Sequence, residues 1–125
     1  MTVCITPTVL LIEDDVDVLD TLADVLELEG YVPLLAANGR EGLTLFETQD
    51  PALVITDLLM PEKEGIETII EMRRLRPDAK IIAISGGGLL KNMDFLEMAT
   101  KLGATAILRK PFEPDDLVDL VRRVL

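Results

Sequence analysis

The sequence predicts an α/β protein built on a single parallel sheet. Along its 125 residues, five short apolar runs alternate with five segments of helical periodicity, and short links join them. The runs are too apolar to face water on either side, which is typical of parallel strands covered by helices on both faces. Because crossovers between parallel strands are right-handed, the alternation favours a doubly wound, flavodoxin-like (βα)5 three-layer sandwich. We expect the five-stranded sheet to have the order 2-1-3-4-5, which places strands 1 and 3 side by side where ligands bind.

Glycine, proline and asparagine residues indicate where helices end or begin and which strand lies at an edge in the first two strand–helix units. Residues 8–12 predict the first strand, and Gly30 ends the helix that follows it. Residues 31–36 predict the second strand, at an edge of the sheet because Pro33 has no N–H to donate to a ladder. Asn38 caps a short second helix. The first helix has an apolar face at Leu19, Leu22, Ala23 and Leu26 and an acidic face at Asp17, Asp20, Asp24 and Glu27.

The third unit holds the first functional candidate. Residues 53–55 predict a strand buried on both faces, and the run ends at Thr56 and the carboxylate of Asp57. Chemistry in an open parallel sheet sits at the carboxyl ends of the strands, so a functional group is expected at Asp57. The alternative is that Asp57 only hydrogen-bonds its own turn. The next helix, closed off by Pro77, has its predicted inner face at Ile66, Ile69, Ile70 and Met72.

The last two units follow the same pattern. Residues 80–84 predict the fourth strand, which ends at Ser85, and residues 104–108 predict the fifth. Between them, a fourth helix that stops at Gly103 has its inner face at Met93, Leu96, Ala99 and Leu102. Pro114 opens the last helix. Its charges suit the helix dipole, with Asp115 and Asp116 at the positive end and Arg122 and Arg123 at the negative end.

The composition narrows the range of partners. A formal net charge of -11 argues against binding to nucleic acid or an anionic membrane, and it suits a metal cation or a basic protein. With one cysteine, Cys4, and no histidine, zinc binding and thiol catalysis are disfavoured. No apolar run reaches the roughly 18 residues of a membrane span, and residues 1–7 lack signal-peptide features, so we expect a cytoplasmic protein. We expect one domain over residues 1–125, its core at about 8–125, without an output domain in this chain.

Polar groups converge on one edge of the predicted sheet. Asp14 and Asp15 follow the first strand, Asp57 the third, Ser85 the fourth and Lys110 the fifth. Each like-charged pair at about 4 Å costs about 4 kcal/mol at an effective dielectric near 20, and a hard divalent cation such as Mg²⁺ would remove that cost. Lys110 can neutralise Asp57 or bind phosphate oxygens. Singly, the aspartates and Ser85 could cap helices and Lys110 could be solvated, but their joint occurrence at successive strand ends indicates a site.

These residues resemble the receiver domain of two-component response regulators over about Thr8 to Leu125. The motifs that carry the resemblance are the Asp14-Asp15 pair, Asp57 with Met60-Pro61 and Gly65 after it, Ser85 after an apolar strand, and Lys110-Pro111-Phe112. The resemblance implies a signalling domain that catalyses only its own phosphorylation and dephosphorylation. Its implied partners are a sensor histidine kinase or phosphotransfer protein, and a downstream target protein or output domain. Weak homodimerisation on phosphorylation is a further expectation.

The resemblance also assigns roles to individual residues. Asp57 would accept a phosphoryl group from a kinase histidine, Ser85 would bind a phosphoryl oxygen, and Lys110 would pair with the phosphorylated Asp57. These roles fit phosphoryl transfer, in which positioning and charge neutralisation supply most of the catalysis. The implied Mg²⁺ ligands are Asp14, Asp15, Asp57 and the backbone carbonyl of Leu59.

The chain departs from the family at Ile107. The family usually has an aromatic switch residue three places before the lysine, and isoleucine is smaller and stiff at χ1. We therefore expect the response to phosphorylation at residues 85–93, where glycines 86–88 give the backbone freedom. We also expect the kinase to dock near the acidic first helix through a basic surface, because residues 1–39 contain no Lys or Arg, and the alternative is that this acidic face is merely solvated.

The sequence supports other functions less well. A hydrolase of the haloacid-dehalogenase type would have a second Asp two residues after Asp57, where this chain has Leu59. A flavin-binding domain shares the strand order, but the phosphate-binding loop after the first strand is missing. The main alternative is a receiver-like module that is not phosphorylated and only docks proteins.

Overall fold

A five-stranded parallel sheet forms the middle layer of the computed structural model, which describes residues 7–58, 64–85, 101 and 103–125. The strands lie in the order β2-β1-β3-β4-β5, and every neighbouring pair is parallel, as predicted. The strands are β1 (Thr8–Ile12), β2 (Val32–Ala36), β3 (Leu53–Asp57), β4 (Ile81–Ser85) and β5 (Ala106–Arg109). The helices are α1 (Val16–Leu28), α2 (Gly39–Gln49), α3 (Glu64–Leu75) and α5 (Pro114–Val124).

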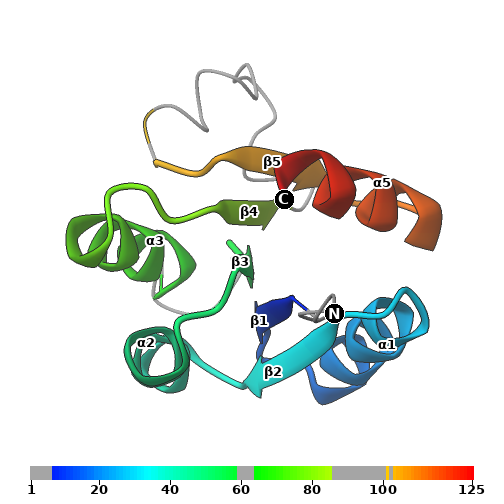
Figure 1. Ribbon diagram of the computed structural model, residues 1–125, viewed down its shortest axis with the longest axis horizontal. Coiled ribbons are helices and arrows are strands. Elements are labelled where there is room, and N and C mark those ends of the chain that lie inside the picture. The colour runs from blue at the N-terminus through cyan, green and yellow to red at the C-terminus, as the bar shows by residue number, and fades with distance from the viewer. Residues whose placement is uncertain (1–6, 59–63, 86–100, 102) are drawn as a thin grey trace, which may run out of the picture.

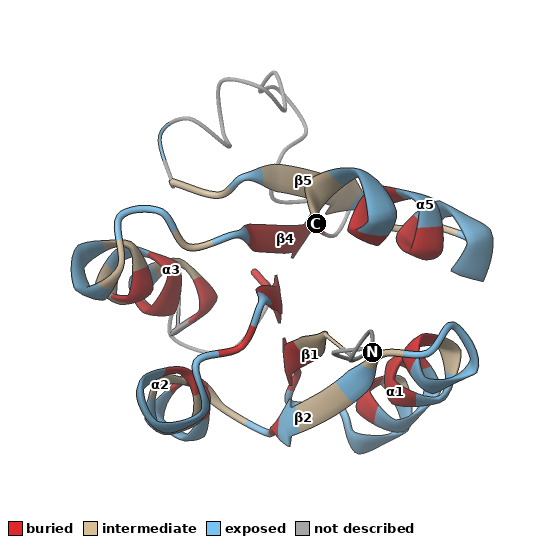
Figure 2. Ribbon diagram, in the orientation of Figure 1, coloured by how far each residue is buried: buried red, intermediate tan, exposed pale blue. Residues whose placement is uncertain are grey.

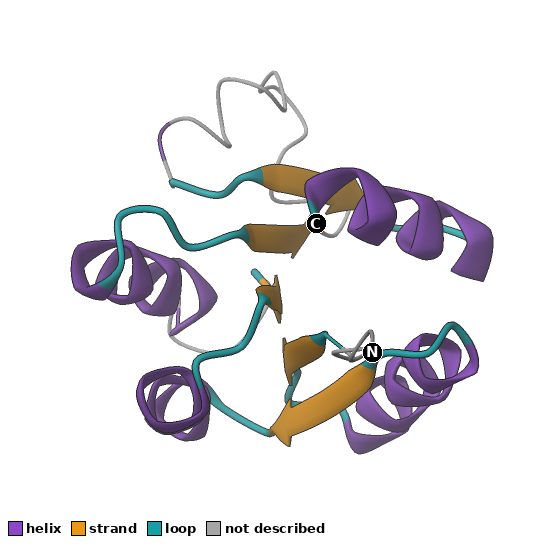
Figure 3. Ribbon diagram, viewed as in Figure 1, coloured by secondary structure: helices purple, strands orange, loops and turns teal. Residues whose placement is uncertain are grey.

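The helices cover both faces of the sheet. In Figure 1, α2 and α3 lie on one side of the strands and α1 and α5 on the other, which is the three-layer sandwich that the alternating pattern predicts. Figure 3 shows the same division, with the loops joining strand ends to helices. Within the described residues, no helix is both long enough and apolar enough to cross a membrane.

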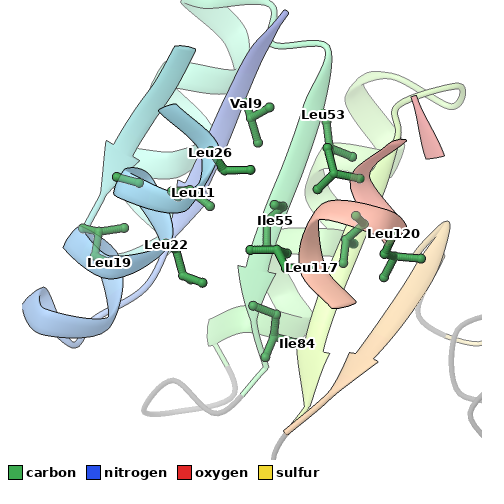
Figure 4. Packing of buried hydrophobic residues seen from close by; sticks show 13 residues of the cluster. Val9, Leu11, Leu19, Leu22, Leu26, Leu53, Ile55, Ile84, Leu117 and Leu120 are labelled. Atoms are coloured by element: carbon green, nitrogen blue, oxygen red, sulfur yellow. The ribbon is translucent and has the colours of Figure 1, made fainter. Parts of the chain in front are cut away.

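Alternation along the strands divides the core into two clusters. In β1, Leu10 and Ile12 face α2 and α3, whereas Val9 and Leu11 face α1 and α5. Figure 4 shows the second cluster, in which side chains of α1 and α5 meet those of the sheet. Every residue of β3 and β4 is buried, so Asp57 and Ser85 lie at the ends of two fully buried strands (Figure 2).

β2 is an edge strand, as Pro33 predicts. It pairs only with β1, and Pro33 lies opposite Val9 in the register. The Val32 N–H donates to the carbonyl of Pro7, on the β1 side of the strand. Val32 and Leu35 are partly exposed along this edge, at 46% and 42%.

Most helix ends match the sequence signals. Gly30 has a φ of 89° just past α1, the Asn38 side chain accepts from the Glu41 N–H at the start of α2, and Pro114 begins α5. Strands β2, β4 and β5 begin one or two residues later than predicted. The fourth predicted helix, apart from Lys101, lies outside the described residues, as do residues 86–93 of the expected switch loop.

The predicted inner face of α3 is wrong at one position. Ile69 and Met72 are fully buried and Ile66 packs against the same cluster, but Ile70 is 45% exposed. Thr68 is buried in its place, at 3% exposure. The buried face of α3 therefore consists of residues 65, 68, 69 and 72, and Ile70 lies outside this face.

Candidate functional site

Four side chains from different strand ends meet at the carboxyl edge of the sheet. Asp57 is the last residue of β3 and is 2% exposed, and Ser85 is the last residue of β4 and is fully buried. Lys110 comes directly after β5. Glu13 comes directly after β1 and is 4% exposed. A parallel sheet brings these ends together, so the burial of two carboxylates there follows from the topology.

Lys110 forms an ion pair with Asp57. Its Nζ donates to Asp57 Oδ2 at 2.8 Å, and its backbone N–H donates to the Ser85 carbonyl, also at 2.8 Å. Partial burial pulls the pKa of Lys110 down, but the hydrogen bond to Asp57 and the charges of Asp57, Glu13 and Asp14 outweigh it. The pKa therefore lies above its usual value, and Lys110 stays positively charged beside the buried carboxylate.

Glu13 is the residue that the sequence reasoning missed. Its Oε1 accepts from the Asp15 N–H at 3.1 Å, while its Oε2 is buried without a hydrogen-bond partner among the described residues. Burial and then the neighbouring Asp57 carboxyl raise the pKa of Glu13, whereas the hydrogen bond from the Asp15 N–H and the charge of Lys110 lower it, and together these effects raise it from 4.5 to about 8. In the metal-free fold, Glu13 therefore holds a proton near neutral pH.

Asp15 occupies a different place from the one expected. Its carboxylate accepts from the backbone N–H groups of Asp17 and Val18, at 3.0 and 3.4 Å, and so caps α1. Asp14 is exposed, and its charge acts on Lys110. The acidic pair nearest Asp57 and Lys110 is thus Glu13 and Asp14 instead of Asp14 and Asp15. The signal was present in the sequence, because a helix that begins at residue 16 takes residue 15 as its cap.

The carboxylates fit a hard cation by their chemistry. Among the described residues, no three Asp, Glu, His or Cys side chains are close enough together to hold a metal ion, and Leu59 lies outside the described range. However, Glu13 Oε2, which has no hydrogen-bond partner among the described residues, is buried close to the Asp57 carboxylate, which is paired with Lys110. A divalent cation bound through oxygen would replace the proton of Glu13 and offset the charge of both carboxylates, which is the role that Mg²⁺ fills in such sites.

Ser85 has a hydroxyl ready to donate. Its Oγ is buried and has no hydrogen-bond partner among the described residues. Asp57 lies opposite Ile84 in the β3–β4 register, and the Leu58 N–H donates to the Ile84 carbonyl at 2.9 Å, so Ser85 is one residue beyond the level of Asp57. A buried hydroxyl without a partner costs free energy, which an acceptor oxygen arriving at Asp57 would recover.

Ile107 lies within β5, the last strand in the sheet order, three residues before Lys110. It is opposite Ala83 in the β4–β5 register and packs, half-buried, against the core cluster on the α2–α3 side. Its side chain is thus part of the core packing. How it responds to phosphorylation stays a prediction.

Comparison with known proteins gives a consistent result. The family model of the response regulator receiver domain matches residues 9–122. The chemotaxis protein CheY of Thermotoga maritima is 34% identical over 117 residues, covering 93% of this chain and 95% of that protein. Sporulation initiation phosphotransferase F of Bacillus subtilis is 29% identical, covering 94% of this chain and 92% of that protein.

The chain is also similar to a solved receiver structure and to part of a longer relative. A CheY-like response regulator receiver domain protein from Methanospirillum hungatei JF-1 superposes with a TM-score of 0.83 at 32% identity, over 94% of this chain and 92% of that one. Some relatives are longer: the chain spans 59% of the photosynthetic apparatus regulatory protein RegA of Rhodovulum sulfidophilum, which is 32% identical over 89% of this chain. With its sheet order, its buried Asp57 and the family match over nearly its whole length, the chain belongs to the response regulator receiver domain family.

Proposed function

We propose that Asp57 accepts a phosphoryl group from a phosphohistidine of a sensor kinase or phosphotransfer protein, and that this switches a surface read by a downstream protein. A carboxylate oxygen of Asp57 forms the new P–O bond while the donor P–N bond breaks and its electron pair stays on the imidazole nitrogen. The observation that supports this most is the Asp57 carboxylate itself, 2% exposed at the end of β3 and paired with Lys110 at 2.8 Å. Receiver domains act in this way in two-component signalling, and the chain is a signalling domain of that family.

The neighbouring side chains have separate tasks in the proposal. Lys110 offsets the charge that the phosphoryl group adds, and the Ser85 hydroxyl donates to one of its oxygens. Glu13, Asp14 and Asp57, with the backbone carbonyl of Leu59, would hold Mg²⁺, and the three carboxylates would have to move closer together than they are in this structure to do so, while Asp15 keeps α1 in place as its cap. When bound, Mg²⁺ supplies charge neutralisation for the carboxylates and the incoming phosphoryl oxygens.

Intact-mass measurement after incubation with acetyl phosphate and Mg²⁺ tests the proposed acceptor. The wild type should gain one phosphoryl mass, and Asp57→Asn should gain none. Asp50→Asn is the matched control, because Asp50 is an exposed aspartate just ahead of the same strand. An adduct on Asp57→Asn, or one that forms equally in chelator, contradicts the proposal. A wild type that never forms an adduct favours the alternative of a receiver-like module that only docks proteins.

The surface beside α1 supports a basic partner. A groove of about 410 Å³ runs between α1 and the start of α5, and its apolar walls are Val18, Leu22, Val25, Phe112 and Leu117. Asp17 also lines the groove, and the segments that form it carry further exposed carboxylates, at Asp20 and Asp24 on α1 and at Glu113, Asp115, Asp116 and Asp119 on the α5 side. An amphipathic helix with an apolar stripe and basic edges would complement this groove, and we place the kinase or phosphotransfer protein there.

Phosphotransfer measured against ionic strength tests the docking surface. Asp20→Lys with Asp24→Lys should slow transfer from the cognate kinase at least about tenfold at low salt, because the double variant loses the electrostatic attraction to a basic partner. The transfer rate should also depend less on salt, because less attraction remains for salt to screen. Glu47→Lys with Glu67→Lys is the matched control, since it makes the same charge change beside the α2–α3 groove. Equal slowing by both double variants would point to net charge and not to this groove. Acetyl phosphate, which needs no docking, should modify all of these proteins alike.

A further inference from the structure

Gly65 lies in the first turn of α3, against the backbone that carries Asp57. A Cβ atom built on Gly65 would come within 2.9 Å of the Leu58 Cα and would be closer still to the Asp57 carbonyl oxygen. Real Cβ atoms do not approach other atoms so closely, so one of the two segments would have to move. That backbone is tied to the sheet on its other side, because the Leu58 N–H donates to the Ile84 carbonyl in β4 at 2.9 Å, so a shift forced by α3 would be passed to the end of β3, where Asp57 lies.

The contact at Gly65 affects where the Asp57 carboxylate lies. Asp57 reaches Lys110 Nζ at 2.8 Å, and Glu13 packs beside it with its Oε2 buried. These contacts come from β1 and from the end of β5, whereas Gly65 touches the Asp57–Leu58 backbone from α3. Moving that backbone would move Asp57 relative to Lys110 and Glu13.

A second helical glycine provides a contrast. A Cβ on Gly42 of α2 would also be too close to its neighbour, but that neighbour is the end of the Ile12 side chain, whose Cγ1 would be 2.8 Å away. A side-chain end can turn or shift at modest cost, and Ile12 points into the core away from Asp57. Both glycines are buried, and both substitutions by alanine would gain similar helix propensity.

We propose that Gly65 is a positioning residue for phosphoryl transfer: its missing side chain lets α3 seat on the Asp57–Leu58 backbone and so fixes where the phosphoacceptor carboxylate lies. This inference rests on the proposed role of Asp57. It is separate from the stability of α3, because alanine is the better helix former and would by itself strengthen the helix.

Phosphorylation kinetics of two alanine variants test the proposal. Gly65→Ala should take up phosphoryl groups from acetyl phosphate with a rate constant lower on the order of tenfold to hundredfold, since displacements near 1 Å have such effects on positioned groups. The phosphorylation rate constant of Gly42→Ala should stay within about twofold of the wild-type value, even if its melting temperature falls as much as that of Gly65→Ala. Circular dichroism melts establish that each protein is folded at the assay temperature. If Gly65→Ala is not, both variants are assayed with the osmolyte TMAO, which favours the folded state.

A double-mutant cycle on Mg²⁺ affinity separates positioning from general damage. Gly65→Ala should weaken Mg²⁺ binding more in the wild-type background than in the Asp57→Asn background, because the part of the effect that acts through the Asp57 carboxylate is absent from the second. Equal weakening in both backgrounds, or phosphorylation of Gly65→Ala as fast as that of Gly42→Ala, overturns the inference. If the wild type itself gains no phosphoryl group on Asp57, the proposed function fails instead, so the two failures are distinguishable.

Discussion

The proton on Glu13 makes the stability of the metal-free protein depend on pH. The pKa of Glu13 is about 8 in the fold and 4.5 in the unfolded chain, so between these values the folded state binds one more proton. The contribution is fully present below pH 4.5 and is lost as the pH rises through about 8, with a slope of at most about 1.4 kcal/mol per pH unit.

Urea unfolding in chelator between about pH 5 and pH 8 measures this term. The wild type should lose more free energy of unfolding over that range than Glu13→Gln, which carries no titrating group at this position. Glu27→Gln, a change at an exposed carboxylate of α1, should follow the wild type. Parallel curves for the wild type and Glu13→Gln would show that Glu13 is ionised in the fold.

Single residues show where sequence reasoning reached its limit. Asp57, Ser85 and Lys110 could be predicted because each lies at or just after the end of a largely apolar strand of a parallel sheet. Glu13 was passed over because three acidic residues in a row leave open which of them faces inward, and only the start of α1 decides it. Ile70 was misplaced for a related reason, since apolar residues at both 69 and 70 fit a 3.6-residue period until the packing of α3 selects one.

At the start of α1, two neighbouring acidic residues have different roles. Asp15 caps the helix, and Glu13 belongs to the candidate metal site. Asp15→Ala removes an acceptor for two backbone N–H groups and should lower the free energy of unfolding by about 1 kcal/mol. Asp15→Ser keeps the cap and should restore most of that stability. Both variants should keep wild-type Mg²⁺ affinity as measured by titration calorimetry, whereas Glu13→Gln should lose at least about tenfold, in line with the loss of a carboxylate near a hard cation. A loss in Asp15→Ser as large as that in Glu13→Gln would return Asp15 to the metal site.

Helices and strands were predicted best where a single residue type has a single physical role. Gly30, Asn38 and Pro114 each mark a helix end through backbone geometry or hydrogen bonding that few other residues supply, and all three do so in the structure. Strand starts were predicted less well, because an apolar run continues smoothly into a loop that still packs on the core. Thr105, just before β5, illustrates this, since its N–H and hydroxyl still bond to Ile81 of β4.

At the scale of the whole molecule, Mg²⁺ binding should appear as added stability. A ligand that binds only the folded state adds about 1.4 kcal/mol at roughly ten times its dissociation constant. Thermal melts with and without Mg²⁺ should show this increment for the wild type and a smaller one for Asp57→Asn and Glu13→Gln. Na⁺ at the same ionic strength controls for general screening of the net charge of -11. Identical increments in all three proteins would argue against a metal site at Asp57.

The open edge of β2 has a consequence for the protein at high concentration. N–H groups along a strand point alternately to either side, and because Val32 donates toward β1, the odd-numbered residues donate outward. Tyr31 and Ala37 give their N–H groups to acceptors in their own chain, and Pro33 has none to give. Leu35 is left as the one outward donor within residues 31–37. An incoming strand from another copy would therefore find one outward N–H donor and only carbonyl acceptors beside it, so a regular ladder on β2 is disfavoured despite the apolar side chains exposed there.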